Sequence, residues 1–91
     1  MSDLARTVRI CNARGLHARA SAKLVKVASG FDAEVRIGKD GQIVDARSIM
    51  GLLMLGAGIG SDVTVEAEGP EAEAALQAVV TLIEGRFDEE N

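Results

Sequence analysis

Two kinds of apolar periodicity alternate along this chain, and their order limits the possible folds more than any other feature. Apolar residues recur at every second position near residues 7–11, 33–37 and 63–68, which is the spacing of half-buried strands. Elsewhere they recur at three and four residues, as in amphipathic helices. Because the strands alternate, one sheet face should be solvated and the other covered by helices. The pattern therefore predicts a two-layer α+β domain.

The first helix is expected to begin at Ala18, and Gly30 is placed to end it. Its apolar positions recur at helical spacing, while Arg19, Lys23 and Lys26 share the opposite side. A basic and an apolar face on one helix indicate that it packs on the sheet with its charges outward.

A hairpin is expected next, because the turn residues GKDG stand between 33–37 and a short third strand at 42–46. A short helix should start near Ser48, since serine is a favoured N-cap. The last helix should have Pro70 in its first turn and an apolar face that reaches Phe87. The element order is then β-α-β-β-α-β-α.

The length of 91 residues allows one hydrophobic core, so we expect residues 1–91 to form a single domain. Residues 1–4 and 88–91 are expected to be flexible tails. With two phenylalanines and no tryptophan or tyrosine, the core must be aliphatic. The single Cys11 excludes an internal disulfide and is expected to be a small buried or half-buried hydrophobe in a reducing compartment.

Neither a signal peptide nor a membrane span is expected. The start, MSDLARTVRI, carries charges where a signal peptide is apolar, and IMGLLMLGAGIG is too short and too rich in glycine to cross a bilayer. The sequence therefore predicts a soluble, cytoplasmic protein with no membrane insertion.

The formal net charge of −4 hides an uneven distribution. Six basic residues and no acid lie between Leu4 and Phe31, whereas nine acids and one base follow from Asp62 onward. Such asymmetry predicts a basic docking face on an acidic protein, although solvated helix faces would give the same pattern. The acidic balance and the scarcity of aromatic side chains argue against a nucleic-acid partner.

Few residues could carry chemistry. One histidine and one cysteine do not make a tetrahedral zinc site. A nucleophilic pair of Cys11 and His17 would need a deep pocket, which so short a chain is not expected to form. The stretch GAGIG does not match G-x-G-x-x-G and leads into a strand, so it is interpreted as a loop. We therefore expect neither a metal nor a cofactor.

His17 is the one histidine, and it precedes the first predicted helix, between Arg14 and Arg19. The backbone N–H groups of Ala18, Arg19 and Ala20 lack intrahelical acceptors, so this helix end favours an anion and disfavours imidazolium. The Arg19 guanidinium matches phosphate oxygens. These residues suggest an anion site around a neutral, nucleophilic nitrogen. A histidine that only caps the helix in solvent stays open as the alternative.

Two stretches resemble motifs of a known family. RGLHARAS, residues 14–21, is similar to the active-site motif of HPr, the histidine-containing phosphocarrier of the bacterial phosphoenolpyruvate:sugar phosphotransferase system. DARSIMGLLMLGAGIGSDVTVEAEG, residues 45–69, resembles the family's second motif, and the likeness runs from Arg6 to Ile83. The resemblance implies an open-faced β-sandwich, in which three helices cover one face of a four-stranded antiparallel sheet, and a monomeric protein.

By this resemblance His17 is the phosphoryl acceptor, through Nδ1, and Arg19 stabilises the phosphate. Enzyme I, charged by phosphoenolpyruvate, would supply the phosphoryl group, and EIIA-type domains would receive it. The protein would be a carrier and not an enzyme, because phosphoryl transfer needs mainly alignment and charge stabilisation, which a partner can supply. Ala20 departs from the family's usual proline, which would fix the helix start. In this respect the chain resembles nitrogen-related, alphaproteobacterial carriers.

The same resemblance implies that Ser48 is the site that HPr kinase/phosphorylase uses. A phosphate there would add a charge of about −1.5 to −2 beside an apolar stripe and would repel an acidic partner. The residues proposed for partner docking are three basic and three apolar ones: Arg14, Lys23, Lys26, Ile49, Met50 and Leu53. Two other function classes stay open, namely a regulatory binding module acting through Ser48 and a small phosphatase with an arginine-lined anion site.

Overall fold

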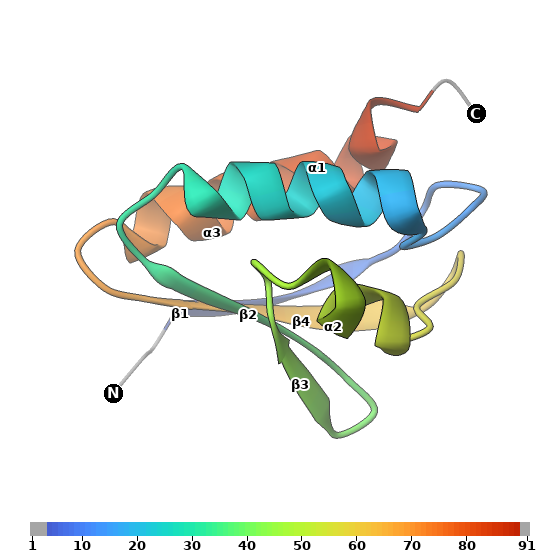
Figure 1. The fold of residues 1–91 in the computed structure, drawn as a ribbon, viewed down its shortest axis with the longest axis horizontal. Coiled ribbons are helices and arrows are strands. Elements are labelled where there is room, and N and C mark those ends of the chain that lie inside the picture. Colours follow the sequence, from blue (N-terminus) through green and yellow to red (C-terminus); the bar gives the residue numbers. More distant parts are fainter. Residues whose placement is uncertain (1–3, 90–91) are drawn as a thin grey trace.

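The computed structural model describes residues 4–89, and its main elements follow the predicted order (Figure 1). The elements are β1 (Leu4–Arg9), α1 (Ala18–Ser29), β2 (Glu34–Lys39), β3 (Gln42–Asp45), α2 (Ile49–Met54), β4 (Asp62–Glu68), α3 (Ala72–Glu84) and a 3₁₀ turn, η1 (Arg86–Asp88).

The four strands form one antiparallel sheet in the order β1-β4-β2-β3. The two central strands pair Val35 with Ala67 and Ile37 with Val65. Figure 1 shows α1 and α3 lying across the same face of this sheet, and α2 packs beside α1 and β3. The predicted open-faced sandwich, with three helices and a four-stranded antiparallel sheet, is confirmed.

The two faces of the sheet differ as the alternation predicts. Val63, Val65 and Ala67 of β4 are buried under the helices, together with the aliphatic side chains of α1 and α3. On the open face, Arg36 forms ion pairs with the carboxylates of three neighbours at 3.2, 3.6 and 3.3 Å, those of Glu34, Glu66 and Glu68. Half-exposed ion pairs contribute little stability, so the helix-covered face holds the fold together.

The turn of the hairpin has the predicted chemistry. Asp40 and Gly41 have φ angles of 52° and 86°, the pair of left-handed residues that a two-residue hairpin loop of type I′ requires. Aspartate and glycine tolerate this region better than most residues.

Several boundaries differ from the prediction. Strand β1 begins at Leu4, so this residue lies in the sheet and not in a flexible tail. Helix α3 begins at Ala72, after Pro70, which therefore lies outside the first turn. The buried Phe87 lies beyond the end of α3, in a turn whose three residues have φ angles of 61°, 54° and 63°. Periodicity alone does not reveal such a left-handed turn.

The predicted C-terminal tail, 88–91, is also corrected. Asp88 belongs to η1, and Glu89 is hydrogen-bonded to the loop before α1. The remaining tail positions, 1–3 and 90–91, lie outside the described residues.

Candidate functional site

His17 ends the loop between β1 and α1, and a second loop holds this segment in place. The Leu16 N–H donates to the Ala57 carbonyl at 2.8 Å. Gly15 precedes it with φ +65°, and a Cβ there would come within 2.5 Å of the same Ala57 oxygen and 2.7 Å of the Gly58 Cα. Only glycine permits this close approach, so the position of His17 depends on it.

Both ring nitrogens of His17 have partners. Nδ1 accepts a hydrogen bond from the Arg19 N–H at 3.3 Å, which makes His17 the N-cap of α1. Nε2 lies 2.5 Å from Oε2 of Glu89, and 23% of the His17 side chain is exposed. A carboxylate can only accept, so these partners assign the proton to Nε2 and the lone pair to Nδ1. Nδ1 is therefore the nucleophilic nitrogen.

A buried asparagine ties the same carboxylate to the loop. The Nδ2 group of Asn12 donates to the Gly15 carbonyl at 2.8 Å and faces the two carboxylate oxygens of Glu89 at 3.2 and 3.3 Å. The pKa of Glu89 is lowered, first by the hydrogen bond with His17 and further by those with Asn12 and by the charge of Arg14. The carboxylate is thus held in its charged form beside the ring.

The predicted anion donors surround the start of α1. Ala18, Arg19 and Ala20 are its first three residues, and their N–H groups have no intrahelical carbonyl to bond. One of them, that of Arg19, is used by His17 itself. The Arg14 and Arg19 side chains are exposed. The helix begins at Ala18 although Ala20 replaces the expected proline, and Ala20 is fully buried.

The basic residues proposed for docking differ in whether another part of the chain already binds them. Lys26 is exposed like the two arginines, whereas Lys23 donates to the Phe87 carbonyl at 2.7 Å and lies 4.0 Å from Asp88. Lys23 is therefore already engaged with the C-terminal turn, which the helical pattern did not indicate.

Ser48 lies at the start of the short helix, as predicted. Its Oγ accepts the Gly51 N–H at 3.0 Å, so it is the N-cap of α2. The sequence pattern predicts that at least half of the apolar residues at 49, 50, 52 and 53 pack in the core, but of these four only Leu52 is buried. The exposed apolar side chains of α2 form a group that we call the α2 patch: Ile49, Met50, Leu53 and Met54. Met54, which is 75% exposed, was not predicted as part of it.

Two residues of the site were missed from the sequence, Asn12 and Glu89. Asn12 stands in a loop rich in turn residues, and Glu89 in the acidic run DEEN. Neither context distinguishes a contact with His17 from a solvated position. Only the turn at 86–88, which no local pattern reveals, brings Glu89 to the ring.

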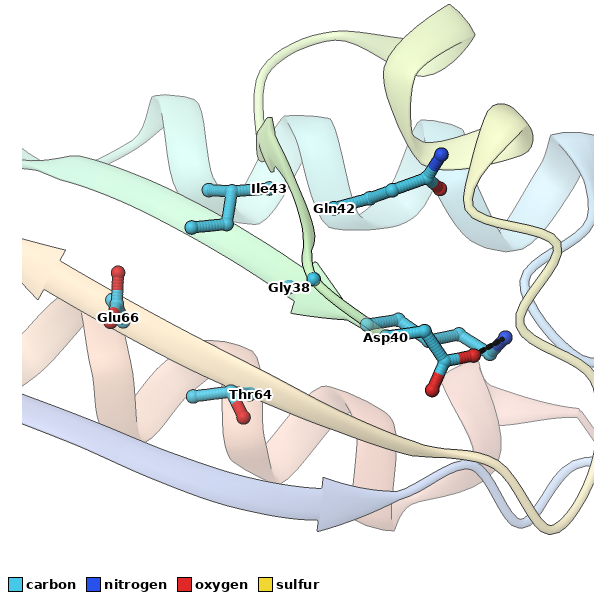
Figure 2. Close-up of a pocket in the computed structure, with 8 residues that line it drawn as sticks. Gly38, Asp40, Gln42, Ile43, Thr64 and Glu66 are labelled. Atoms are coloured by element: carbon cyan, nitrogen blue, oxygen red, sulfur yellow. Dashed lines mark hydrogen bonds and ion pairs between the residues drawn. The ribbon is translucent and has the colours of Figure 1, made fainter.

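A shallow hollow of about 250 Å³ lies at the β2–β3 hairpin, lined by backbone glycines and by side chains such as Gln42, Thr64 and Glu66 (Figure 2). No predicted site residue lines this hollow.

Cys11 is half-buried, and its Sγ lies 3.6 Å from the carbonyl oxygens of Ile83 and Glu84.

Between residues 4 and 89, no three side chains of His, Cys, Asp or Glu are grouped so as to hold a metal ion. Over the same residues, no helix combines the length and the apolar character that crossing a bilayer requires.

Comparison with known proteins identifies the family. The family model of the HPr component of the phosphotransferase system, described as a phosphorylation site, matches residues 4–85. The chain belongs to the HPr family. It is 51% identical over 86 residues to the phosphocarrier protein HPr of Cupriavidus necator, covering 94% of this chain and 97% of the relative.

Members of two kinds resemble this chain. It is 47% identical over 89 residues to the phosphocarrier protein NPr of Shewanella violacea, with 98% of each chain covered. The crystal structure of an HPr from Thermoanaerobacter tengcongensis superimposes with a TM-score of 0.92 at 43% identity, covering 97% of this chain and 99% of that one. The chain is therefore an HPr-type phosphocarrier in both sequence and fold.

Proposed function

We propose that His17 accepts a phosphoryl group on Nδ1 from Enzyme I and passes it to an EIIA-type domain. The observation that carries this proposal is the arrangement of the ring, with Nε2 paired to Glu89 and the Nδ1 lone pair directed at the first turn of α1. As the donor's bond to phosphorus breaks, Nδ1 forms the new bond with the lone pair that accepts the Arg19 N–H in the free protein; that N–H is released and can donate to a phosphate oxygen instead. No proton has to leave the ring, because Nδ1 is already unprotonated.

The groups around Nδ1 suit an incoming phosphoryl group. The N–H groups of Ala18, Arg19 and Ala20 and the helix dipole stabilise negative charge at this end of α1. Arg19 is exposed and, among the described residues, no ion pair engages its side chain, so it is available to bind phosphate oxygens. A helix end supplies only about 0.3–1 kcal/mol, which suits a carrier that must release the phosphate again.

The exposed surroundings of His17 support a carrier rather than an enzyme. Arg14, Ala18 and Arg19 beside it are all exposed, so alignment of the donor and exclusion of water have to come from the partner. A phosphatase would need to hold and activate a water molecule itself. We therefore propose a role without independent turnover, in which Arg14, Lys26 and the α2 patch meet an acidic and apolar partner surface.

We further propose that Ser48 is a regulatory site for HPr kinase/phosphorylase. Its hydroxyl adjoins the α2 patch, so a phosphate of charge about −1.5 to −2 would lie beside the exposed Ile49 and Met50. That charge would weaken docking of an acidic partner without unfolding the core. The exposed patch equally fits a second candidate function, a regulatory binding module that acts through Ser48 with little phosphoryl flux.

Incubation with phosphoenolpyruvate and a cognate Enzyme I tests the carrier role. The chain should gain one acid-labile phosphate, and His17→Ala should abolish it. Arg19→Ala should slow transfer about tenfold or more, because charge-assisted hydrogen bonds to phosphate are lost. Arg6→Ala removes the same charge from β1 and serves as the matched control, with an unchanged rate expected. A wild-type chain that gains no phosphate would refute the carrier role.

The regulatory role has a separate test. Ser48→Asp should reduce phosphate uptake from Enzyme I and weaken partner binding, whereas Ser48→Asn, of similar size but neutral, should affect both much less. If Ser48→Asp accepted phosphate and bound partners as wild type does, the regulatory proposal would be wrong. Uptake of phosphate by Ser48→Asn at the wild-type rate would show that the charge is responsible.

A further inference from the structure

The contact between Glu89 and His17 is held by neighbouring groups of the fold and is not a contact between two freely exposed side chains. The two side chains are only 19% and 23% exposed. The buried Asn12 faces both carboxylate oxygens of Glu89, at 3.2 and 3.3 Å, and bonds the Gly15 carbonyl as well. The loop before α1 and the C-terminal segment therefore share one hydrogen-bonded group.

An unusual turn delivers Glu89 to this place. Arg86, Phe87 and Asp88 all have left-handed φ angles, a conformation that residues other than glycine adopt rarely and almost never in succession. Phe87 is fully buried and anchors the turn, and Lys23 donates to its carbonyl at 2.7 Å. Burial of Phe87 fixes the turn, but it does not by itself require a carboxylate two residues later.

The chemistry of the ring explains what that carboxylate can do. As Nδ1 of His17 bonds to phosphorus, the ring becomes positively charged and its Nε2–H becomes a stronger donor. A carboxylate at Nε2 stabilises this charge and fixes the ring orientation, as the aspartate does for the histidine of a serine protease triad. Neither the Arg19 N–H nor any other described group performs this role at Nε2.

We propose that Glu89 is a positioning residue for phosphoryl acceptance: its carboxylate, held by Asn12, keeps the proton on Nε2 of His17 and presents Nδ1 to the donor. This inference rests on the proposed carrier function. The C-terminal segment would then take part in the reaction, although its acidic sequence does not indicate such a role.

The test uses the full-length chain and two independent readouts. In proton and nitrogen NMR spectra without Enzyme I, the wild type should show a His17 Nε2–H that exchanges slowly with water. Glu89→Ala should lose this slow exchange. In single-turnover uptake at saturating phosphorylated Enzyme I, Glu89→Ala should be about fivefold slower, the effect expected from one hydrogen bond. The Enzyme I concentration at half-saturation should stay unchanged, because Glu89 acts on the ring and not on docking.

Two further variants separate geometry from charge. Glu89→Gln still accepts a hydrogen bond through Oε1 and should keep the ring signal, with a rate between those of wild type and Glu89→Ala. Asp88→Asn removes the same charge from the adjacent residue, whose side chain is 78% exposed, and asparagine tolerates its left-handed φ. This control should match the wild type in both readouts.

The outcomes are distinguishable. An unchanged ring signal or an unchanged uptake rate in Glu89→Ala would overturn the positioning role. A rate loss shared equally by Asp88→Asn would overturn it too, because net charge would then be the cause. If the ring signal behaved as expected but the wild type took up no phosphate, the carrier function would fail while the contact between Glu89 and His17 stood.

Discussion

Replacing Gly15 by alanine probes the contact that places His17. Gly15 has φ +65°, and an added Cβ would lie 2.5 Å from the Ala57 carbonyl oxygen and 2.7 Å from the Gly58 Cα. Both are backbone atoms, so no side chain can rotate away to make room. The 57–58 loop and the segment before His17 would have to separate.

The cost has two parts. A left-handed φ costs an L residue about 1–2 kcal/mol relative to glycine. Relieving the overlap by moving backbone costs about 1–3 kcal/mol, as for overpacked interiors. Gly15→Ala should therefore lower the free energy of unfolding by about 2–5 kcal/mol, a large share of the roughly 5–15 kcal/mol typical of a small domain. A central loss of about 3 kcal/mol lowers the Tm by about 12–24 °C.

Gly41→Ala is the matched control, and thermal unfolding followed by circular dichroism is the assay. Gly41 also has a left-handed φ, +86°, but a Cβ there meets nothing within 4 Å. It should therefore lose only the conformational part, about 1–2 kcal/mol. If Gly15→Ala were no less stable than Gly41→Ala, the close approach of the two loops would not constrain His17.

Three other outcomes concern the C-terminal turn and α2. Phe87→Ala should lower the free energy of unfolding by about 3–5 kcal/mol in urea titrations, because its ring is fully buried; a loss below about 1 kcal/mol would contradict this packing. Ser48→Ala should cost about 1 kcal/mol in the same assay, since Oγ caps the Gly51 N–H at 3.0 Å, and a neutral result would show that the cap is not formed in solution. The pKa of Glu89 is lowered chiefly by its hydrogen bond with His17, so the stability from this contact is complete above the ordinary glutamate pKa and is lost as pH falls through the lowered one. An NMR titration of the Glu89 carboxyl carbon should therefore have its midpoint below the ordinary value, and a midpoint at or above that value would contradict the contact.

The local parts of the site could be predicted from the sequence. His17 before the first helix and Ser48 before the second were expected at helix starts, and the structure makes each an N-cap. Capping depends on residues two or three positions away, so a short stretch of sequence contains the whole interaction. The basic side of α1 was visible for the same reason.

The partners of these residues across the fold were not predictable. Glu89 is 72 residues from His17, and Lys23 is 64 residues from the carbonyl that it binds. Phe87 continues the apolar spacing of α3, yet it lies in a left-handed turn beyond the helix. A contact at such separation depends on how the chain packs, and periodicity describes only one element at a time.

By itself, then, the sequence determined the order of strands and helices, the face that each buries and the nitrogen-bearing residue at the start of α1, because spacing and capping are local. Only the tertiary structure decided what lies against that residue. Burial of Phe87 bends the chain after α3 and carries Glu89 to Nε2, and the Gly15–Ala57 approach sets the loop that holds His17. Each of these contacts joins segments far apart in the chain, so each depends on how the sheet and the helices pack together.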